Sequence, residues 1–290
     1  MSSTIYLDYN ATTPLHPTVE SAIKKGLSHF GNPSSLHHLG QSAQEDIESA
    51  RESIAQFIGA KSPEHLFFTG SATESNNWVL KSAVSQALLE EKSPHIITSS
   101  IEHTSIISTC NQLEKEGVQV TYLPVDENGR INMEAYSKAI TTSTSLVSIM
   151  AANNETGTIQ PLSQLSDLAK FNGVRFHSDA VQYVGKVPLN VSDIGLDTLS
   201  LSAHKLYGPK GIGCLYCADE TWLTPLLRGG SHERSLRAGT QNTLGIIGFS
   251  SAINWWKQNQ EKEIAHMAKI KEHLIKKIKS LSTPVQIYSP

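Results

Sequence analysis

The chain has few of the features that mark secreted, membrane-bound or nucleic-acid-binding proteins. It contains only 3 cysteines, too few for a disulfide framework, so a reducing cytoplasm is the expected location. No apolar run approaches the ~18 residues of a membrane span, and residues 1–8 lack the basic and apolar regions of a signal peptide. The 24 basic and 27 acidic side chains leave a net charge of −3. This balance gives no electrostatic reason to expect nucleic acid or an anionic membrane as a partner.

Internal repeats and low-complexity segments are also absent, and short apolar runs instead alternate with helical patterns. Strands are predicted at residues 65–69, 95–99, 118–123, 146–151, 174–178, 198–201 and 213–217, because these runs are rich in β-branched and aromatic residues and are bounded by Gly, Pro, Asn or Ser. Helices are predicted at residues 45–58, 71–89, 104–116 and 162–171. The alternation predicts an α/β architecture with a largely parallel sheet.

The last fifty residues have a different pattern. Residues 243–281 predict one long helix with an apolar stripe on one face and lysines on the other. Such a helix either binds a membrane or partner or, more commonly, packs with its charged face in solvent. Pro284 ends it, and residues 285–288 are predicted to begin a further strand. A new element without a successor indicates an incomplete small domain.

Lys205 is the first candidate for chemistry. It follows an apolar strand and precedes a glycine-rich turn into the next strand, the position where ligand sites lie in open α/β sheets. A partly desolvated lysine there is a suitable Schiff-base nucleophile. An isolated lysine at this position is more commonly a surface residue, but Asp179 ends another apolar strand 26 residues earlier. A carboxylate there can keep a pyridine nitrogen protonated, which makes the ring an electron sink.

A phosphate site and further polar groups are predicted at the same edge of the sheet. Residues 67–75 read as a strand, a turn of small residues and a helix start, where backbone N–H groups and the Thr73 and Ser71 hydroxyls bind phosphate. The alternative is an ordinary helix cap that uses Glu74. His103 and Asn154 follow two other strands, and an imidazole there can stack on a cofactor and move protons, although a lone histidine is more commonly a cap residue.

Seven short motifs occur in order along the chain and carry a resemblance to a known family. They are Leu7–Pro14, Gly31–Ser34, Ala72–Ser75, Ile101–His103, Asn153–Glu155, Ser202–Lys205 and Arg237–Thr240. The set resembles the NifS/IscS-type cysteine desulfurases, a group of class V aminotransferases among the fold-type I enzymes that use pyridoxal 5′-phosphate (PLP). The resemblance extends over essentially the whole chain.

The resemblance implies a fold and a set of residue roles. It implies an α/β fold-type I PLP-dependent transferase with a seven-stranded, mostly parallel sheet in a large domain at residues 15–255. Residues 1–14 and 256–290 would then be the remnant of an incomplete small domain. Lys205 would form the Schiff base with the cofactor and His103 would stack on its ring. The other implied cofactor contacts are Asp179 with the ring nitrogen, Gln182 with the ring hydroxyl, Ala72, Thr73, Ser202 and His204 with the phosphate, Asn154 with both the ring and the substrate carboxylate, and Thr240 with the phosphate of the other subunit of a homodimer.

Two departures from the family pattern concern the loop after residue 228 and the catalytic cysteine. The family's glycine-rich loop is here Gly229–Ser235, with serines at positions 231 and 235, and the missing glycines are expected to stiffen or reshape it. The family also carries its catalytic cysteine, with an arginine for the substrate carboxylate, in the C-terminal part of the small domain, and this chain stops before both. Cys110, Cys214 and Cys217 are predicted to be core residues, with Cys214 and Cys217 on opposite faces of one strand.

The resulting hypothesis is a PLP-dependent cysteine desulfurase that converts L-cysteine to L-alanine. It would pass the sulfur, as a persulfide, to iron–sulfur cluster assembly or tRNA thiolation through an acceptor or scaffold protein. This polypeptide alone is expected to bind PLP without persulfide turnover. The alternatives are another class V PLP enzyme, either an aminotransferase or a β-lyase, and a non-catalytic truncated chain that serves as a dimerisation partner.

Overall fold

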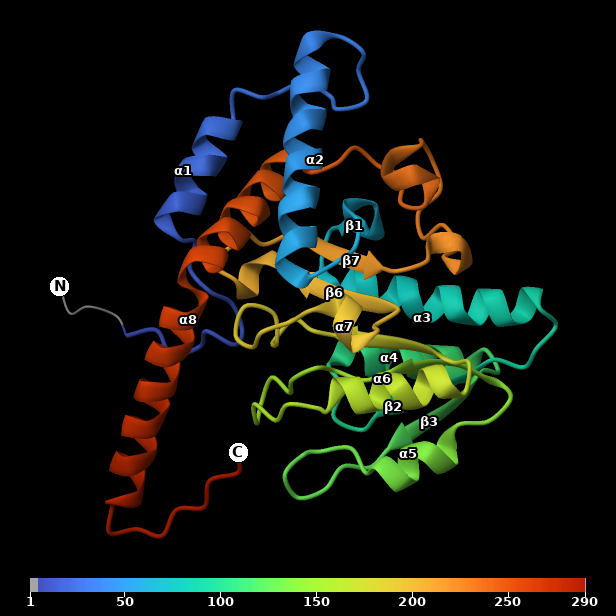
Figure 1. The fold of residues 1–290 in the computed structure, drawn as a ribbon, viewed down its shortest axis with the longest axis vertical. Helices are drawn as coiled ribbons and strands as arrows, with labels where there is room; N and C mark the ends of the chain where they lie inside the picture. The colour runs from blue at the N-terminus through green and yellow to red at the C-terminus, as the bar shows by residue number, and fades with distance from the viewer. Residues whose placement is uncertain (1–4, 290) are drawn as a thin grey trace.

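A seven-stranded mixed sheet forms the centre of the computed structural model, which describes residues 5–289 (Figure 1). The strands are β1 (Leu66–Thr69), β2 (His95–Ser99), β3 (Gln119–Leu123), β4 (Thr144–Ser148), β5 (Arg175–Asp179), β6 (Thr198–Ser202) and β7 (Gly213–Cys217). Their order in the sheet is β1-β7-β6-β5-β4-β2-β3. Only β7 runs antiparallel to its neighbours, and the other pairs are parallel. The predicted α/β class and the seven-stranded, mostly parallel sheet are confirmed.

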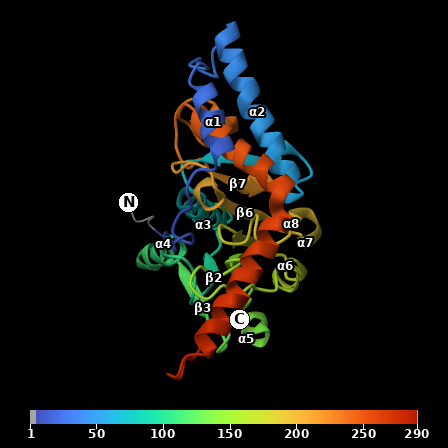
Figure 2. The same cartoon turned by 90° about the vertical axis from the view of Figure 1, so that its left-hand side faces the viewer.

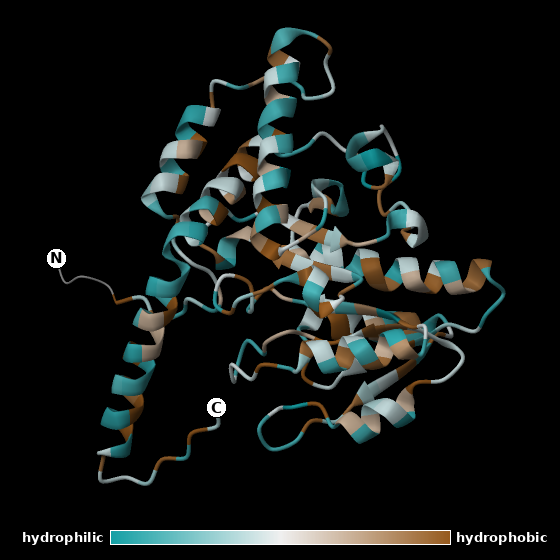
Figure 3. Cartoon of the chain, viewed as in Figure 1, coloured by the Kyte–Doolittle hydropathy of each residue, from teal (hydrophilic) through white to brown (hydrophobic). Residues whose placement is uncertain are grey.

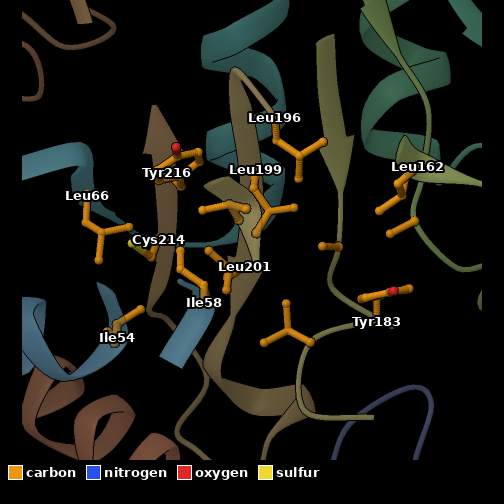
Figure 4. Packing of buried hydrophobic residues seen from close by; sticks show 14 of the residues in the cluster. Ile54, Ile58, Leu66, Leu162, Tyr183, Leu196, Leu199, Leu201, Cys214 and Tyr216 are labelled. Carbon is orange, nitrogen blue, oxygen red and sulfur yellow. The ribbon is translucent and has the colours of Figure 1, made fainter. Parts of the chain in front are cut away.

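Helices cover both faces of this sheet and create two hydrophobic cores. Residues of α3 (Ala72–Leu89) and α4 (Thr104–Lys115) form one core. Residues of α2 (His38–Ile58), α6 (Leu162–Phe171) and the first part of α8 (Thr243–Lys279) form the other, part of which Figure 4 shows. Cys214 lies in the second core and Cys217 in the first. The prediction that these thiols occupy opposite faces of one strand is therefore confirmed.

The sequence patterns located the strands well but missed short helices. The structure adds α1 (Pro17–Gly26), α5 (Met133–Ala139) and α7 (Val191–Ile194), together with the 3₁₀ turns η1 (Pro63–His65), η2 (Ala203–Lys205), η3 (Glu220–Trp222) and η4 (His232–Ser235). Helix α1 is capped by the side chain of His16, which is not among the residue types that usually mark a helix start. Helix α2 begins at His38, seven residues before the predicted start.

Helix α8 belongs to the body of the molecule only in its first part. Its buried residues end at Trp256, and the rest of the helix extends away from the sheet (Figures 1 and 2). Part of the predicted apolar stripe is exposed there, with Ile270 at 53% and Leu274 at 56% exposure, and Figure 3 shows hydrophobic colour along this part. Residues 285–288 form no strand, so that prediction is wrong. The division into residues 15–255 and residues 1–14 plus 256–290 stays a prediction.

Within residues 5–289, no helix combines the length and the apolar character needed to cross a membrane.

Candidate active site

A cavity of about 720 Å³ opens at the edge of the sheet where the parallel strands end. Its walls come from the ends of β5 and β6, the start of α3, the residues before α4, the segment after β4 and residues 7–11. Of the predicted site residues, it brings together Ala72, Thr73, His103, Asn154, Asp179, Gln182, Ser202, His204 and Lys205. Thr240 does not line the cavity, and it lies exposed in the loop before α8.

Lys205 lies in η2, directly after β6, and its side chain is partly buried. Its ammonium group donates hydrogen bonds to the backbone oxygens of Asn10 and Ala11, the latter at 2.8 Å. Burial lowers the pKa of Lys205, although the carboxylates of Asp179 and Asp8 act in the opposite direction. A lysine whose charged form is disfavoured loses its proton more readily, which is the property that a Schiff-base amine needs.

Asp179 ends β5 and is only 7% exposed. Its Oδ2 accepts a hydrogen bond from Nδ2 of Asn76 at 2.7 Å, and its Oδ1 accepts one from the backbone N–H of Val181 at 3.0 Å. Burial raises the pKa of Asp179, whereas these two hydrogen bonds and the charges of His103 and Lys205 lower it. A carboxylate that accepts two hydrogen bonds keeps free lone pairs. Asp179 can therefore accept a further hydrogen bond from a donor in the cavity.

The first turn of α3 combines a satisfied helix cap with free backbone donors. Ser71 Oγ accepts a hydrogen bond from the N–H of Glu74 at 3.2 Å, and the Glu74 carboxylate accepts one from the N–H of Gly70 at 2.8 Å. The N–H groups of Ala72 and Thr73 lie in the first helical turn, where no carbonyl of the helix itself can accept them. The cap and the phosphate-site interpretations are therefore compatible, because the cap leaves these two donors for an anion.

Gly213 at the start of β7 keeps this turn close to the sheet. A Cβ atom at this glycine would lie 2.6 Å from the carbonyl carbon of Ser71 and 2.8 Å from the nitrogen of Ala72. Any side chain would therefore displace the backbone that forms the anion-binding turn. This role was not predicted from the sequence, although a glycine at the start of an apolar strand is a general signal of close backbone approach.

His103 and His204 both present imidazoles to the cavity. His103 is the N-cap of α4, and its Nδ1 accepts a hydrogen bond from the N–H of Ser105 at 3.1 Å, so the residue is a cap and a cavity residue at once. His204 Nδ1 lies 3.1 Å from Oγ1 of Thr12. Burial, with the nearby charges of Lys205 and Lys210, lowers the pKa of His204 to about 4, so this imidazole is neutral at pH 7.

The N-terminal segment contributes contacts that the sequence analysis did not foresee. Asn10 donates from Nδ2 to the backbone oxygen of Asn154 at 3.2 Å. Its own backbone oxygen accepts from Nε2 of Gln182 at 2.9 Å and also from Lys205. The polar segment between Leu7 and the first helix has no periodicity that predicts a structure. Only the family motif Leu7–Pro14 connected this segment with the site.

The three thiols lie away from this chemistry. Cys110, Cys214 and Cys217 are buried, at 0%, 0% and 1% exposure, and none of them lines the cavity. Burial raises the pKa of Cys110 and of Cys214 to about 12, and that of Cys217 still further. A thiol that is buried and protonated is a poor nucleophile, which agrees with the prediction that they are core residues.

Comparison with known proteins gives consistent matches in sequence and in structure. The family model for class V aminotransferases matches residues 5–290. The cysteine desulfurase IscS of Dictyoglomus turgidum is 46% identical over the whole chain, which spans 73% of that relative. The cysteine desulfurase IscS of Clostridium botulinum (strain Hall) is 41% identical, again over the whole chain, and 72% of it is covered.

Solved structures give the same result. A NifS-like protein superposes with a TM-score of 0.95 at 38% identity, covering 99% of this chain and 78% of that one. A structure of SspA in complex with cysteine superposes with a TM-score of 0.84 at 40% identity, covering 91% of this chain and 78% of the other. The sheet, the cavity and these matches show that this chain belongs to the class V aminotransferase family and, within it, to the cysteine desulfurases.

Proposed function

We propose that this chain holds PLP in the cavity and acts on L-cysteine, yielding L-alanine while the sulfur passes to an acceptor thiol as a persulfide. Enzymes of the class V family and its cysteine desulfurases use PLP. The observation that carries the proposal is the meeting, in one cavity, of an amine from Lys205, a buried carboxylate from Asp179 and free N–H groups at the start of α3.

The donor set fits the chemical groups of PLP. The cofactor has an aldehyde, a ring nitrogen, a ring hydroxyl and a phosphate. Lys205 would hold the aldehyde, Asp179 the ring nitrogen and Gln182 the hydroxyl, while the first turn of α3 would hold the phosphate together with Ser202 and His204. When bound, PLP withdraws electrons from the carbon atoms of an attached amino acid.

Side chains of the protein would move the protons and bind the substrate. Burial favours the neutral amine of Lys205, so this residue can take a proton from the substrate Cα and return one to Cβ. His103 accepts hydrogen bonds at Nδ1, so its Nε2 remains available to move a proton. The imidazole of His103 would stack on the ring of PLP. Asn154 lines the cavity and would hold the substrate carboxylate.

The acceptor thiol is proposed to come from outside the 3 cysteines of this sequence. Those thiols are buried and protonated, so none can attack a sulfur atom in the cavity. We therefore expect this polypeptide alone to bind PLP without persulfide turnover. Robust sulfide release from the chain mixed with PLP and L-cysteine, lost in Lys205→Ala, would contradict this expectation.

The decisive experiment is a visible absorption spectrum of the chain reconstituted with PLP. Wild type should show the absorption of a protein-bound Schiff base, and borohydride should fix the cofactor on Lys205. Lys205→Ala should lose both signals, whereas Lys210→Ala, an exposed lysine five residues later that does not line the cavity, should keep them. Absence of the band in wild type would sink the proposal.

Product analysis with an added acceptor thiol identifies the reaction. Alanine and persulfide in equal amounts support desulfuration. A keto acid as the main product would instead indicate an aminotransferase or a β-lyase.

We further propose a cytoplasmic homodimer in which Thr240 contacts the phosphate held by the other subunit. Support comes from the place of Thr240, which lies exposed in a loop rather than in the cavity of its own chain. Sedimentation velocity should give a dimer. Mixed dimers of Lys205→Ala with Thr240→Ala test the contact, because the Thr240→Ala subunit keeps Lys205 and would receive Thr240 from its partner, which gives one complete site in each mixed dimer. A monomer would exclude this arrangement.

A further inference from the structure

A buried chain of hydrogen bonds reaches Asp179 from the side away from the cavity. Thr198, His177 and Asn76 are each 0% exposed. Oγ1 of Thr198 lies 2.9 Å from Nδ1 of His177, and Nε2 of His177 lies 3.1 Å from Oδ1 of Asn76. Nδ2 of Asn76 then donates to Oδ2 of Asp179 at 2.7 Å. None of the first three residues lines the cavity.

The hydrogen bonds from Thr198 through His177 and Asn76 to Asp179 are all donated in the same direction, toward Asp179. The Asn76 amide uses both N–H groups, one toward Asp179 and one toward Oγ of Ser105 at 2.9 Å. Its oxygen must therefore accept, so His177 carries its proton on Nε2. Burial lowers the pKa of His177 to about 3, so the ring is neutral and its Nδ1 accepts from the hydroxyl of Thr198. Turning the amide over would set its oxygen against the Asp179 carboxylate.

The second N–H of Asn76 leads to the other ring-facing residue. Because Ser105 Oγ accepts from Asn76, its own proton is directed to Nδ1 of His103 at 2.8 Å. The N–H of Ser105 donates to the same nitrogen at 3.1 Å. One amide thus orients both a carboxylate and an imidazole of the cavity.

We propose that Asn76 is a positioning residue that fixes the charge and direction of Asp179 and the tautomer of His103, with His177 and Thr198 holding its amide in the required orientation. This inference rests on the proposed function, because it assigns a purpose to the two groups that would face the PLP ring. Asn76 itself touches neither cofactor nor substrate.

Electrostatics explain why the carboxylate needs this support. Asp179 is buried, and its carboxyl group interacts electrostatically with Glu102, His103 and Lys205. Burial raises the pKa of Asp179, and the hydrogen bond from Asn76 is the largest effect that lowers it. Without that bond, the pKa of Asp179 would rise further, and the carboxylate would lose the contact that directs it toward a protonated ring nitrogen.

The first test uses the wild-type chain without cofactor and is independent of PLP binding. Nitrogen-15 NMR of labelled histidine should show His177 with its proton on Nε2 and a bare Nδ1 at neutral pH. A proton on Nδ1 would overturn the proposal, because the Asn76 amide would then have to turn away from Asp179.

The second test compares variants by PLP affinity and by the pH titration of the visible band. Asn76→Ala should weaken PLP binding about ten- to hundredfold, the factor that corresponds to one hydrogen bond to a charged group. Thr198→Val, which keeps the volume but removes the hydroxyl, should move affinity in the same direction by a smaller factor. Lys81→Ala, at an exposed residue of α3 that does not line the cavity, should leave both readouts unchanged.

The outcomes separate this inference from the proposed function. Failure of wild type to bind PLP would sink the proposed function, while the tautomer measurement would still test the network. Equal affinity and an equal titration for wild type and folded Asn76→Ala would overturn the positioning role. Circular dichroism and the thermal midpoint establish folding, and if Asn76→Ala does not fold, Thr198→Val and the tautomer decide.

Discussion

Arg237 joins the loop that carries Thr240 to the first turn of α3 through the carboxylate of Glu74. Its Nε lies 2.7 Å from Oε1 of Glu74, and its Nη2 lies 3.3 Å from Oε2. Oε2 also accepts from the N–H of Gly70. One carboxylate therefore closes the anion-binding turn and anchors the neighbouring loop.

Replacement of Arg237 should loosen both elements. Both side chains of the pair are about one-fifth exposed, so we expect Arg237→Ala to cost about 1–2 kcal/mol of unfolding free energy and to weaken PLP binding roughly tenfold. Arg237→Lys should recover only part of either loss, because lysine lacks the planar fork. Arg228→Ala, at an exposed arginine of the same segment, is the control. Unchanged PLP affinity in Arg237→Ala would contradict the coupling.

A second anchor holds the same loop through a buried ion pair. The two terminal nitrogens of the Arg51 guanidinium, Nη1 and Nη2, donate to Glu233 at 2.9 and 3.0 Å, and Oε2 of Glu233 also accepts from the N–H of Phe68 at 2.9 Å. Arg51 also contacts the exposed Glu48, at 3.1 Å. Arg51 therefore contacts one buried carboxylate, Glu233, and one exposed carboxylate, Glu48.

Removal of these two carboxylates should have very different effects on stability. Glu233→Ala leaves a buried guanidinium without its partner, so we expect a loss of about 3–5 kcal/mol in the unfolding free energy. Glu48→Ala should change it by less than about 0.5 kcal/mol, because Glu48 is half exposed. Urea denaturation of both variants measures the difference. Similar losses for the two would refute the distinction.

The two serines of the loop after residue 228 occupy different backbone conformations. Ser231 has φ −79°, which any residue adopts. Ser235 has φ 66° and ends a left-handed run that begins at Glu233. The loop is therefore strained at only one of the two positions where the family carries glycine.

Glycine at these positions should have opposite effects. Ser235→Gly should raise the unfolding free energy by about 0.5–1 kcal/mol, because glycine adopts positive φ without steric cost. Ser231→Gly should lower it by a similar amount through the greater entropy of the unfolded chain. Thermal or urea unfolding of the pair measures the contrast. A gain in both variants would show that backbone conformation is not the cause.

Much of this architecture was predictable because buried parallel strands leave a strong local signal. The runs that became β2 and β7 were located without error, since continuous apolar residues end there in polar or glycine positions. The same ends identified Asp179 and Lys205, because residues that follow parallel strands meet at one edge.

Tertiary contacts determined what local patterns missed. Asn76 looks like an ordinary helix residue in the sequence, and its importance comes from His177, which is 101 residues away and is reached only through the fold. Asn10 similarly acts across 195 residues on Lys205. The segment at 285–288 was predicted to form a strand from its composition, but an apolar run without a neighbouring strand makes no ladder.

Glu102 supplies a prediction for pH dependence, because it is a buried acid beside the cavity. Its Oε1 accepts from Ser99 Oγ at 2.5 Å and from the N–H of Met150 at 2.8 Å, while its Oε2 is buried without a partner. Burial raises the pKa of Glu102 to about 8. The acid is therefore protonated at neutral pH in the folded chain and ionised in the unfolded one.

The sign of the effect follows from proton binding. Between about pH 4.5 and pH 8 the folded state holds a proton that the unfolded state has lost, so this group lowers stability as pH rises through that window. We expect its contribution to the unfolding free energy to fall by about 3 kcal/mol between pH 5 and pH 8. Glu102→Gln, which cannot ionise, should flatten the stability profile by that amount. Parallel profiles for wild type and Glu102→Gln would mean that Glu102 is ionised in the folded chain, and its unpartnered oxygen would then have to be solvated.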